Sequence, residues 1–438
     1  MARALPAITA PYHAHQATDS RDKIGFWLSV LLVCLLPIER MLIPLNLKPA
    51  DLTLVLLTVY GLLKALRVRQ RLVFPLLVPF WLILISSLIA TLAGFAHFEN
   101  VVVVVQEIYL FIWFIVLVNL LKTFPLYDLD WLMKIWSLVA CLEAATTLMG
   151  MMRIGPSMFY TKPTYDEVRV ATDFVRGVGT YANSNAAAVY LSVSFFVLLA
   201  TSWPLWLRSI LGIWIYAGMF GTGSNGALIS TLVGLMALAI VHSSMKSHRG
   251  ILLWGALVSI GLGSVASVLL LLGVSPSLLS NFGFDVSGDL FFHTAGRFSH
   301  SLESRLSIAR WAWNIYSHNP LGIGPNSFST IEGSLHNDYA AFLFERGPLG
   351  LIGWVWMIGA MLVMSLRTAN KLIDRFQSWQ VLALGAAVLA CAINAFTHEI
   401  SHMRQVWLLM VLLFALSYAL LSLQEARPPN SNRLDRIG

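Results

Sequence analysis

Long apolar segments alternate with short polar connectors along most of the chain. A helix needs roughly 20 mainly apolar residues to cross the hydrocarbon layer of a bilayer. About twelve segments reach or approach this length, so the pattern predicts an all-α, polytopic membrane protein with about 12 transmembrane helices. The predicted spans are Gly25–Leu45, Asp51–Leu66, Leu72–Gly94, Val101–Leu121, Trp131–Gly150, Asn185–Ser202, Pro204–Phe220, Ser224–Val241, Ile251–Gly273, Pro348–Leu366, Val381–Phe396 and Val406–Leu423.

The composition agrees with this pattern. Of 438 residues, 57% are hydrophobic and 12% are charged, which is more apolar surface than one soluble core can bury. The first apolar segment follows a polar tail and lacks a small-residue cleavage site, so we interpret it as a retained helix rather than a signal peptide. The three cysteines all lie in apolar segments, where they indicate neither a disulfide framework nor a metal site.

The positive charges indicate an orientation. The net charge is +7, the Lys and Arg residues fall mostly in short connectors between apolar segments, and three strongly basic connectors lie on one side of the predicted bundle. Cytoplasmic loops are enriched in Lys and Arg, so we expect this side and both termini to be cytoplasmic, in a bacterial inner membrane. The scatter of the charges over separate connectors argues against nucleic acid as a partner. The basic connectors contain Lys64, Arg67, Arg69 and Arg71, then Lys246 and Arg249, then Arg367, Lys371 and Arg375.

Two long polar segments lie on the opposite, predicted periplasmic side, where we expect a helical subdomain. Loops longer than about 12 to 15 residues are usually functional or disordered. The predicted organisation is a cytoplasmic tail (1–24), an N-terminal bundle (25–150), a first periplasmic loop (151–184), central helices (185–273), a long periplasmic loop with a catalytic segment (274–347), C-terminal helices (348–423) and a cytoplasmic tail (424–438).

The long second loop contains a predicted helix at Arg305–Tyr316. Its apolar positions fall on one face that carries aromatic residues, which suits a helix lying in the membrane interface or one that simply anchors the loop. The segment His318–Phe328 that follows is rich in glycine and proline and predicts a compact turn. Neither a strand nor a helix start flanks Gly322 and Gly324, so they do not form a dinucleotide-binding motif.

The segment Ser334–Gly350 leads directly into a predicted span. We expect Ser334 to cap a helix with His336 in its first turn, where the helix dipole favours the neutral imidazole that can accept a proton. A surface or capping role for this histidine is the alternative. Asp338 and Glu345 are candidates for orienting His336 or for binding an acceptor, or else for helix capping and an ion pair with Arg346.

The first long loop contributes cations. Lys162, Arg169 and Arg176 lie there, and a guanidinium can bind diphosphate oxygens in a bidentate way without losing its charge. Pairing of these cations with the loop's own carboxylates is the alternative. Those carboxylates are Asp166, Glu167 and Asp173.

At these residues the sequence resembles the O-antigen ligase and polymerase superfamily of bacterial membrane glycosyltransferases. Four short elements in the second half of the chain carry the resemblance, and their order and spacing are more specific than any one of them. They are Arg176, Gly177, Asn183 and Asn185; Ser224, Asn225 and Gly226; Arg305, Trp311, His318, Pro320, Leu321, Gly322 and Gly324; and His336, Asn337, Glu345, Gly347 and Gly350. Where many members have Ser-Arg-Gly, this chain has Ser224-Asn225-Gly226, which blurs the distinction between ligase and polymerase.

The resemblance is greatest to O-antigen ligases and implies a fold similar to type C glycosyltransferases. It implies metal-independent, inverting transfer of a polysaccharide from undecaprenyl diphosphate to a lipid A-core acceptor, without a cofactor. Such a transfer needs a base for the acceptor hydroxyl and cations for the leaving diphosphate. We assign the first role to His336 and the second to Arg176 and Arg305. Arg169, Arg297 and Lys162 are further candidates for phosphate contacts, and Asn337, Asp338 and Glu345 are supporting residues.

Other functions are alternatives to the ligase. A polymerase or a protein O-oligosaccharyltransferase of the same superfamily would use the same donor. A transporter or flippase for a lipid-linked glycan would carry ionisable groups near the bilayer midplane, for which Lys134, Glu107 and Glu143 are candidates. His398, Glu399, His402 and Arg404 form a second polar cluster, which we interpret as a short interhelical turn rather than a metal site.

Overall fold

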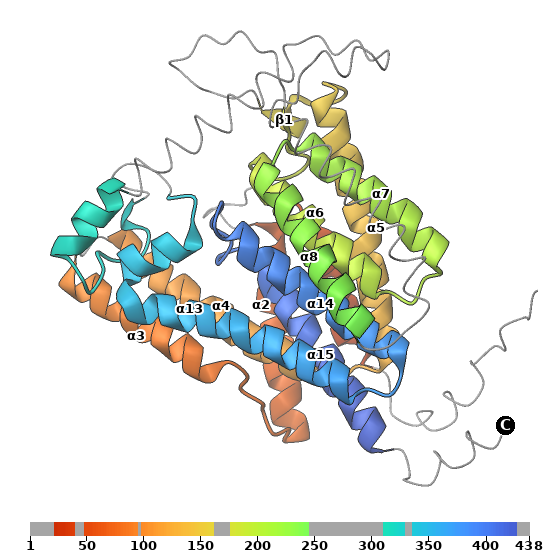
Figure 1. The fold of residues 1–438 in the computed structure, drawn as a ribbon. Coiled ribbons are helices and arrows are strands. Elements are labelled where there is room, and N and C mark those ends of the chain that lie inside the picture. The colour runs from red at the N-terminus through yellow and green to blue at the C-terminus, as the bar shows by residue number, and fades with distance from the viewer. Residues whose placement is uncertain are drawn as a thin grey trace, which may run out of the picture.

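The computed structural model describes residues 22–39, 48–94, 98–161, 176–244, 310–328 and 335–426. They form a bundle of long helices whose polar connectors gather at its two ends (Figure 1). The N-terminal half contains α1 (Lys23–Leu35), α2 (Pro49–Val68), α3 (Leu77–Ala93), α4 (Phe98–Leu121) and α5 (Leu126–Met151). The second half contains α6 (Ser184–Ala200), α7 (Leu205–Gly221), α8 (Asn225–Ser244), α13 (Asp338–Lys371), α14 (Arg375–Asn394) and α15 (Arg404–Glu425).

The predicted all-α, polytopic membrane fold is confirmed. Seven of the described helices are long and apolar enough to cross a membrane, and four shorter apolar helices accompany them. Strand structure within the described residues is limited to the antiparallel pair β1 (Tyr160–Thr161) and β2 (Arg176–Gly177). Eleven predicted spans coincide with these helices, and the ninth, Ile251–Gly273, lies outside the described residues.

Two predicted boundaries were wrong by ten residues, and the others lie within six residues of the observed helix ends. α1 ends at Leu35, well before the predicted end at Leu45, and Pro37 follows in a turn because proline has no N–H to continue the helix. α13 begins at Asp338, ten residues before the predicted span start at Pro348. Its first part is separated from the rest by a break at Gly347, whose φ of 75° is left-handed and whose successor is a proline.

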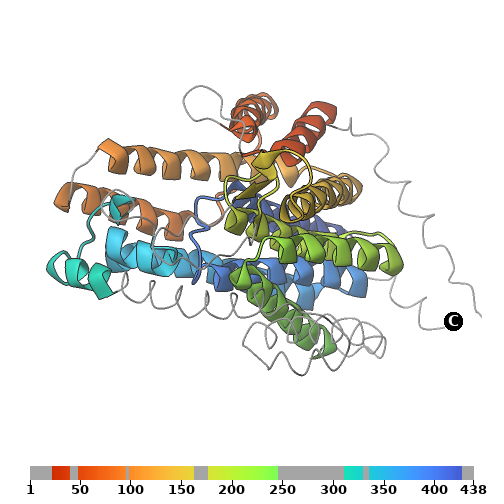
Figure 2. The same cartoon turned by 90° about the horizontal axis from the view of Figure 1, so that it is seen from above.

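Helix α14 lies at the centre of the bundle, in contact with α6, α8, α13 and α15. The hydrophobic effect does not drive helices together within lipid, so close packing between small residues takes its place. A Cβ on Gly353 of α13 would lie only 2.7 Å from the Pro79 carbonyl oxygen, which brings α13 against α3. Figures 1 and 2 both show these two helices side by side at one edge of the bundle.

One end of the bundle carries the basic connectors, and we call it the basic end. Lys64 Nζ lies 2.6 Å from Asp22 Oδ2, which joins the last turns of α2 to the start of α1. Lys122 Nζ donates to the carbonyl of Arg71, and Gln424 donates to the carbonyl of Lys371. These bonds bring the ends of α2, α4, α13 and α15 together.

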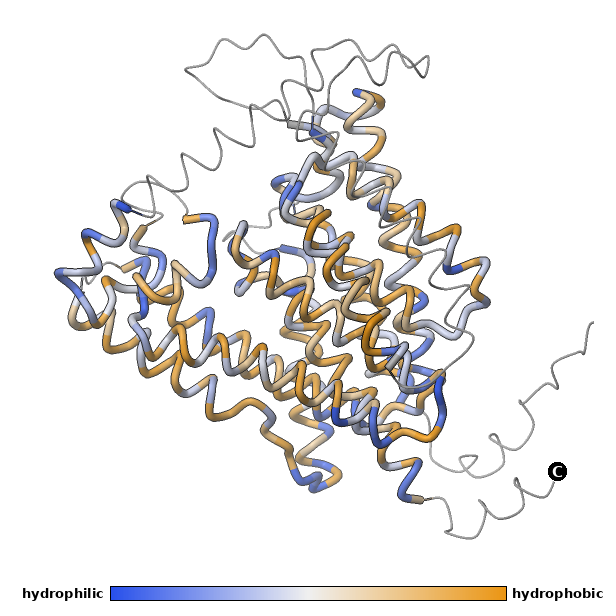
Figure 3. The backbone as a smooth tube through the Cα atoms, in the orientation of Figure 1, coloured by the Kyte–Doolittle hydropathy of each residue, from blue (hydrophilic) through white to orange (hydrophobic). Residues whose placement is uncertain are grey.

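The opposite end carries most of the candidate residues, and we call it the histidine end. It contains Glu39, Lys48, Arg176, His336 and the turn between α14 and α15. Hydrophilic segments gather at both ends, whereas the helices between them are mainly hydrophobic (Figure 3). For the connectors that the structure describes, this division agrees with the sides assigned from the sequence, because each of the long helices runs from one end to the other.

Candidate functional site

His336 lies at the histidine end, exposed to solvent, two residues before α13. Its backbone φ is 50°, a left-handed conformation that is uncommon for residues other than glycine. Its backbone N–H donates to Glu399 Oε1 at 3.2 Å, and its ring centroid lies 6.3 Å from that of His398. Unusual backbone conformations of this kind persist where surrounding contacts impose them, and they cluster at functional sites.

The predicted helix start at Ser334 was wrong. Asn337 is the N-cap, because its side-chain oxygen accepts from the Ala340 N–H at 3.1 Å. Ser and Asn are both good N-caps, so the local sequence could not choose between them. His336 therefore precedes the first turn of α13. The prediction that the helix dipole favours its neutral imidazole assumed a place within that turn, and so it does not apply as stated.

Asp338 holds the start of α13 in place. Its buried carboxylate accepts from the backbone N–H groups of Ile400 and Ser401 at 2.8 and 3.0 Å, and from the Ser401 hydroxyl at 2.8 Å. Its own N–H donates to the carbonyl of Ala395 at 2.8 Å. These bonds fix α13 to the turn between α14 and α15 and leave Asp338 in a positioning role.

The turn between α14 and α15 was predicted as a short interhelical turn, and it is one. The sequence could not show that it lies against His336. His398 is nearly buried, and Glu399 is half-buried and bonded to His336. Exposed His402 lies within electrostatic range of Glu399, Lys48, Glu39 and Arg404. The turn therefore brings a second set of polar groups to the candidate catalytic histidine.

A chain of polar contacts continues from this turn to the N-terminal half. Arg404 binds Asp51 in a bidentate way, with Nε to Oδ1 at 2.6 Å and Nη2 to Oδ2 at 2.7 Å. The Lys48 N–H donates to Asp51 Oδ2, and Lys48 Nζ donates to Glu39 Oε1 at 2.6 Å. Bidentate Arg–carboxylate pairs are among the stronger charged contacts, so this chain fixes α2 to α15 beside the turn.

The same end holds the segment that joins β2 to α6. The Thr180 N–H and hydroxyl both donate to Glu143 of α5, the hydroxyl at 2.6 Å from Oε2. The Glu39 N–H donates to the carbonyl of Thr180 at 3.2 Å. Complete burial raises the pKa of Tyr181 in this segment far above its ordinary value, so its phenol stays neutral.

Arg176 lies on β2, half-buried, at the histidine end. Its Nε donates to the carbonyl of Thr222 at 2.8 Å, and Nη2 donates to Asn185 Oδ1 at 2.9 Å. The carbonyl of Thr147 lies so close to the neighbouring Gly177 that a Cβ at position 177 would collide with it. The guanidinium is thereby fixed in orientation between the start of α6 and the end of α7.

Arg176 is connected to the His336 region through the start of α8. A Cβ on Gly226 would collide with the side chain of Thr397, so α8 and the turn after α14 are in close contact there. Thr397 directly precedes His398 and Glu399. The Ser224-Asn225-Gly226 segment thus lies between the two candidate regions, and its glycine is required by a close approach.

Glu345 holds the turn at His318–Phe328 in place and is not a partner of His336. Its carboxylate accepts from the N–H groups of Asn326 and Phe328 at 2.9 and 3.2 Å. Arg346 lies 3.3 Å from Glu345 Oε2 and 2.7 Å from Glu107 Oε1, so the ion pair expected at this position is present. Gly322 and Gly324 have φ of 92° and 101°, which confirms the compact turn predicted there.

Residues 310–318 are helical and pack against this turn. Ala312 is fully buried with Ile323 and Phe344, whereas Trp313 is 57% exposed. Of the aromatic residues on the predicted face, Trp313 is exposed and Tyr316 is half-buried, and both rings lie within 6.3 Å of the Phe344 ring. An exposed tryptophan at the bundle end is typical of the membrane interface.

Four predicted phosphate contacts, Arg305, Arg169, Arg297 and Lys162, lie outside the described residues. In the part of the chain that is described, no group of three or more His, Cys, Asp or Glu side chains is arranged to hold a metal ion. Of the predicted residues, His336, Asn337 and Asp338 lie together at the start of α13, and Glu399, which was not predicted as a site residue, contacts His336. Arg176 lies on the other side of the contact between Gly226 and Thr397.

Helices long and apolar enough to cross a membrane define the chain as a multi-pass membrane protein, and its candidate site lies at the histidine end. Residues 209–355 match the family model described as O-antigen ligase, and this match supports assignment of the chain to that family. The matched region contains most of α7, all of α8, His336 and the first half of α13. No curated protein matches the chain.

Proposed function

We propose that the chain is an O-antigen ligase that joins a polysaccharide from undecaprenyl diphosphate to a hydroxyl of a lipid A-core oligosaccharide. The observation that carries this proposal is the exposed His336, whose backbone is bound by Glu399 beside the anchored Asp338. The supporting observation is the match to the O-antigen ligase family over a region that includes this histidine.

In the proposed reaction, His336 accepts the proton of the acceptor hydroxyl as its oxygen attacks the anomeric carbon of the donor. The bond from that carbon to the diphosphate oxygen breaks, and the diphosphate leaves with the bonding electron pair. Attack opposite the leaving group inverts the anomeric configuration. Arg176 stabilises the developing charge on the diphosphate, together with Arg305, and the reaction needs no metal ion. The site faces the periplasm of a bacterial inner membrane, with both termini in the cytoplasm.

The charged groups within the spans favour an enzyme over a transporter. Lys134 Nζ lies 2.8 Å from Asp130 on the same helix, and Glu107 binds Arg346. Glu143 binds Thr180 at the histidine end. Each of these groups is paired with another group of the chain, whereas a transport pathway requires ionisable groups that exchange partners with the substrate or ion.

Reconstitution tests the proposal. The purified chain in vesicles, given lipid-linked polysaccharide and lipid A-core, should form a covalent product that carries core and polymer. A flippase would form no such product. A polymerase would lengthen the lipid-linked chain and leave the core unmodified, and a protein O-oligosaccharyltransferase would require a protein acceptor.

Gene deletion separates the same candidates in cells. Loss of the ligase should leave core without any attached polymer. Core that carries one repeat unit would instead identify a polymerase and overturn the ligase proposal.

A further inference from the structure

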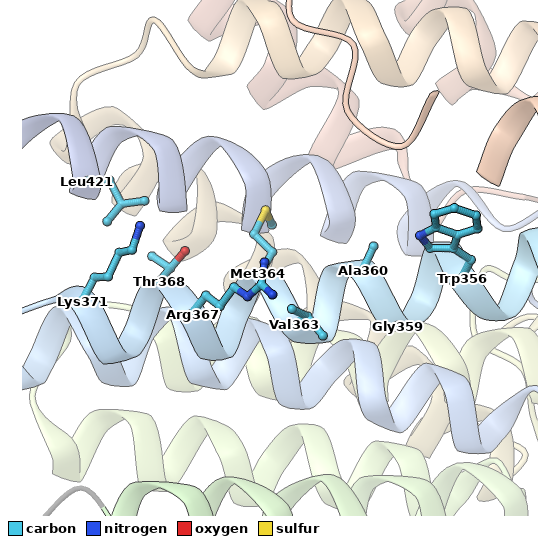
Figure 4. A pocket seen from close by; sticks show the side chains of 9 residues that line it. All are labelled: Trp356, Gly359, Ala360, Val363, Met364, Arg367, Thr368, Lys371 and Leu421. Carbon is cyan, nitrogen blue, oxygen red and sulfur yellow. The ribbon is translucent and has the colours of Figure 1, made fainter. Parts of the chain in front are cut away.

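A groove of about 550 Å³ lies between α13 and α15 at the basic end, far from His336 (Figure 4). Its lining residues are Trp356, Gly359, Ala360, Val363, Met364, Arg367, Thr368, Lys371 and Leu421. Apolar side chains make up most of this lining, and the charged ones lie at the end nearest the polar connector. The groove belongs to the opposite end of α13 from the candidate site, so it cannot hold the reacting groups proposed above.

The two cations of the groove, Arg367 and Lys371, are separated by four residues on one helix and therefore lie on the same face. Both side chains are exposed, and within the described residues no carboxylate forms an ion pair with either of them. Like charges at this spacing repel each other. An anion bound between them would remove this repulsion.

The floor of the groove is open. A Cβ placed on Gly359 would meet no atom within 4 Å, and Ala360 follows it. Trp356 lies at the far end of the groove, and Figure 4 shows Lys371 reaching toward Leu421 of α15. Eleven residues of helix separate Trp356 from Arg367, which is about 16 Å. That length is close to half of a hydrocarbon layer of about 30 Å, or one leaflet.

We propose that this groove binds an anionic phospholipid, with its phosphate between Arg367 and Lys371 and one acyl chain along Gly359 and Ala360. Basic pockets between membrane helices are suited to anionic headgroups, and the apolar floor suits an acyl chain of one leaflet. The lipid would fill the groove between α13 and α15 at the basic end. This proposal does not depend on the enzymatic reaction proposed for the histidine end.

Native mass spectrometry of the full chain, titrated with phosphatidylglycerol or phosphatidylcholine of identical acyl chains, tests the proposal. The wild type should prefer phosphatidylglycerol. A cation near an anionic lipid contributes roughly fivefold to affinity, so the double variant Arg367→Gln, Lys371→Gln should lose about 25-fold. The matched double variant Arg67→Gln, Arg71→Gln removes two cations from the same end of the bundle and should keep the affinity.

A second variant tests the acyl chain. The space around a Cβ at Gly359 is open, so Gly359→Leu should project into the groove, and we expect it to fold normally and bind both lipids less. Equal binding of the two lipids by the wild type, equal losses in the two double variants, or full binding by Gly359→Leu would overturn the proposal. Displacement of phosphatidylglycerol by an equimolar amount of undecaprenyl phosphate would also overturn it, because the occupant would then be a polyprenyl lipid.

Discussion

The two ends of α13 carry charged residues in opposite settings. At the histidine end, Asp338, Glu345 and Arg346 are buried and bonded to other segments of the chain. At the basic end, Arg367 and Lys371 are exposed beside an apolar groove. The difference shows that the charges at the histidine end hold segments of the chain together, and that Asp338 among them fixes the start of α13 beside the exposed His336. The charges at the other end are instead available to a ligand from the membrane.

The largest expected effect is on stability, at Arg346. Arg346→Ala would leave the buried carboxylate of Glu345 and the half-buried carboxylate of Glu107 without their cation, and breaking a buried ion pair typically costs about 3–5 kcal/mol. Thermal unfolding in detergent measures this loss. Lys371→Ala, at the other end of the same helix, should change stability by less than about 0.5 kcal/mol. Similar unfolding temperatures for the two variants would show that the charges at the two ends contribute equally to stability.

The next largest effect is on the rate of transfer, at Arg176. Arg176→Gln should lower kcat/KM roughly 10²–10³-fold, because an aligned donor to a developing anion is lost. Its bonds to Thr222 and Asn185 also hold the bundle, so the unfolding temperature must be measured beside the rate. A loss of activity no greater than the loss of folded protein would assign Arg176 a structural role alone.

A smaller effect is expected at Glu399, which accepts a hydrogen bond from the His336 backbone. Glu399→Ala should lower kcat by up to about tenfold, since a hydrogen bond contributes roughly 0.5–1.5 kcal/mol. Glu399→Gln keeps an accepting oxygen and should recover most of the rate. Equal losses in the two variants would mean that the charge of Glu399 matters rather than its bond to His336.

The smallest effect is expected at the helix cap. Asn337→Ala removes the N-cap of α13 and should cost about 1 kcal/mol of stability. Asn337→Asp preserves the accepting oxygen and serves as the matched control in the same unfolding experiment. An unchanged unfolding temperature for Asn337→Ala would indicate that Asp338 alone fixes the start of α13.

Much of the fold could be predicted from apolar segment length, because a membrane helix must satisfy its backbone hydrogen bonds internally. The segment 338–347 was predicted to lead into a span that begins at Pro348, and it instead forms the first part of α13, although it carries Asp338, Glu345 and Arg346. Those charges are tolerated in a helix because Ile400, Asn326 and Glu107, distant in sequence, bind them. The order of apolar and polar residues within 338–347 does not indicate these partners.

The candidate site shows the same limit. His336 could be singled out from its segment, and Arg176 from its own. The proximity of Glu399 to His336 could not be deduced, because 63 residues separate the two positions. The only signal in the sequence was the density of polar residues between two spans at His398–Arg404, which a short turn explains equally well.

The central claim is that His336 is the general base. The most direct measurement is the transfer rate of purified His336→Ala with lipid-linked polysaccharide and lipid A-core. General-base catalysis contributes typically about 10²–10⁴-fold, so the account predicts a fall of that size with an unfolding temperature equal to that of the wild type. His242→Ala, which removes a histidine at the basic end, should retain the wild-type rate. A wild-type rate for His336→Ala would contradict the account.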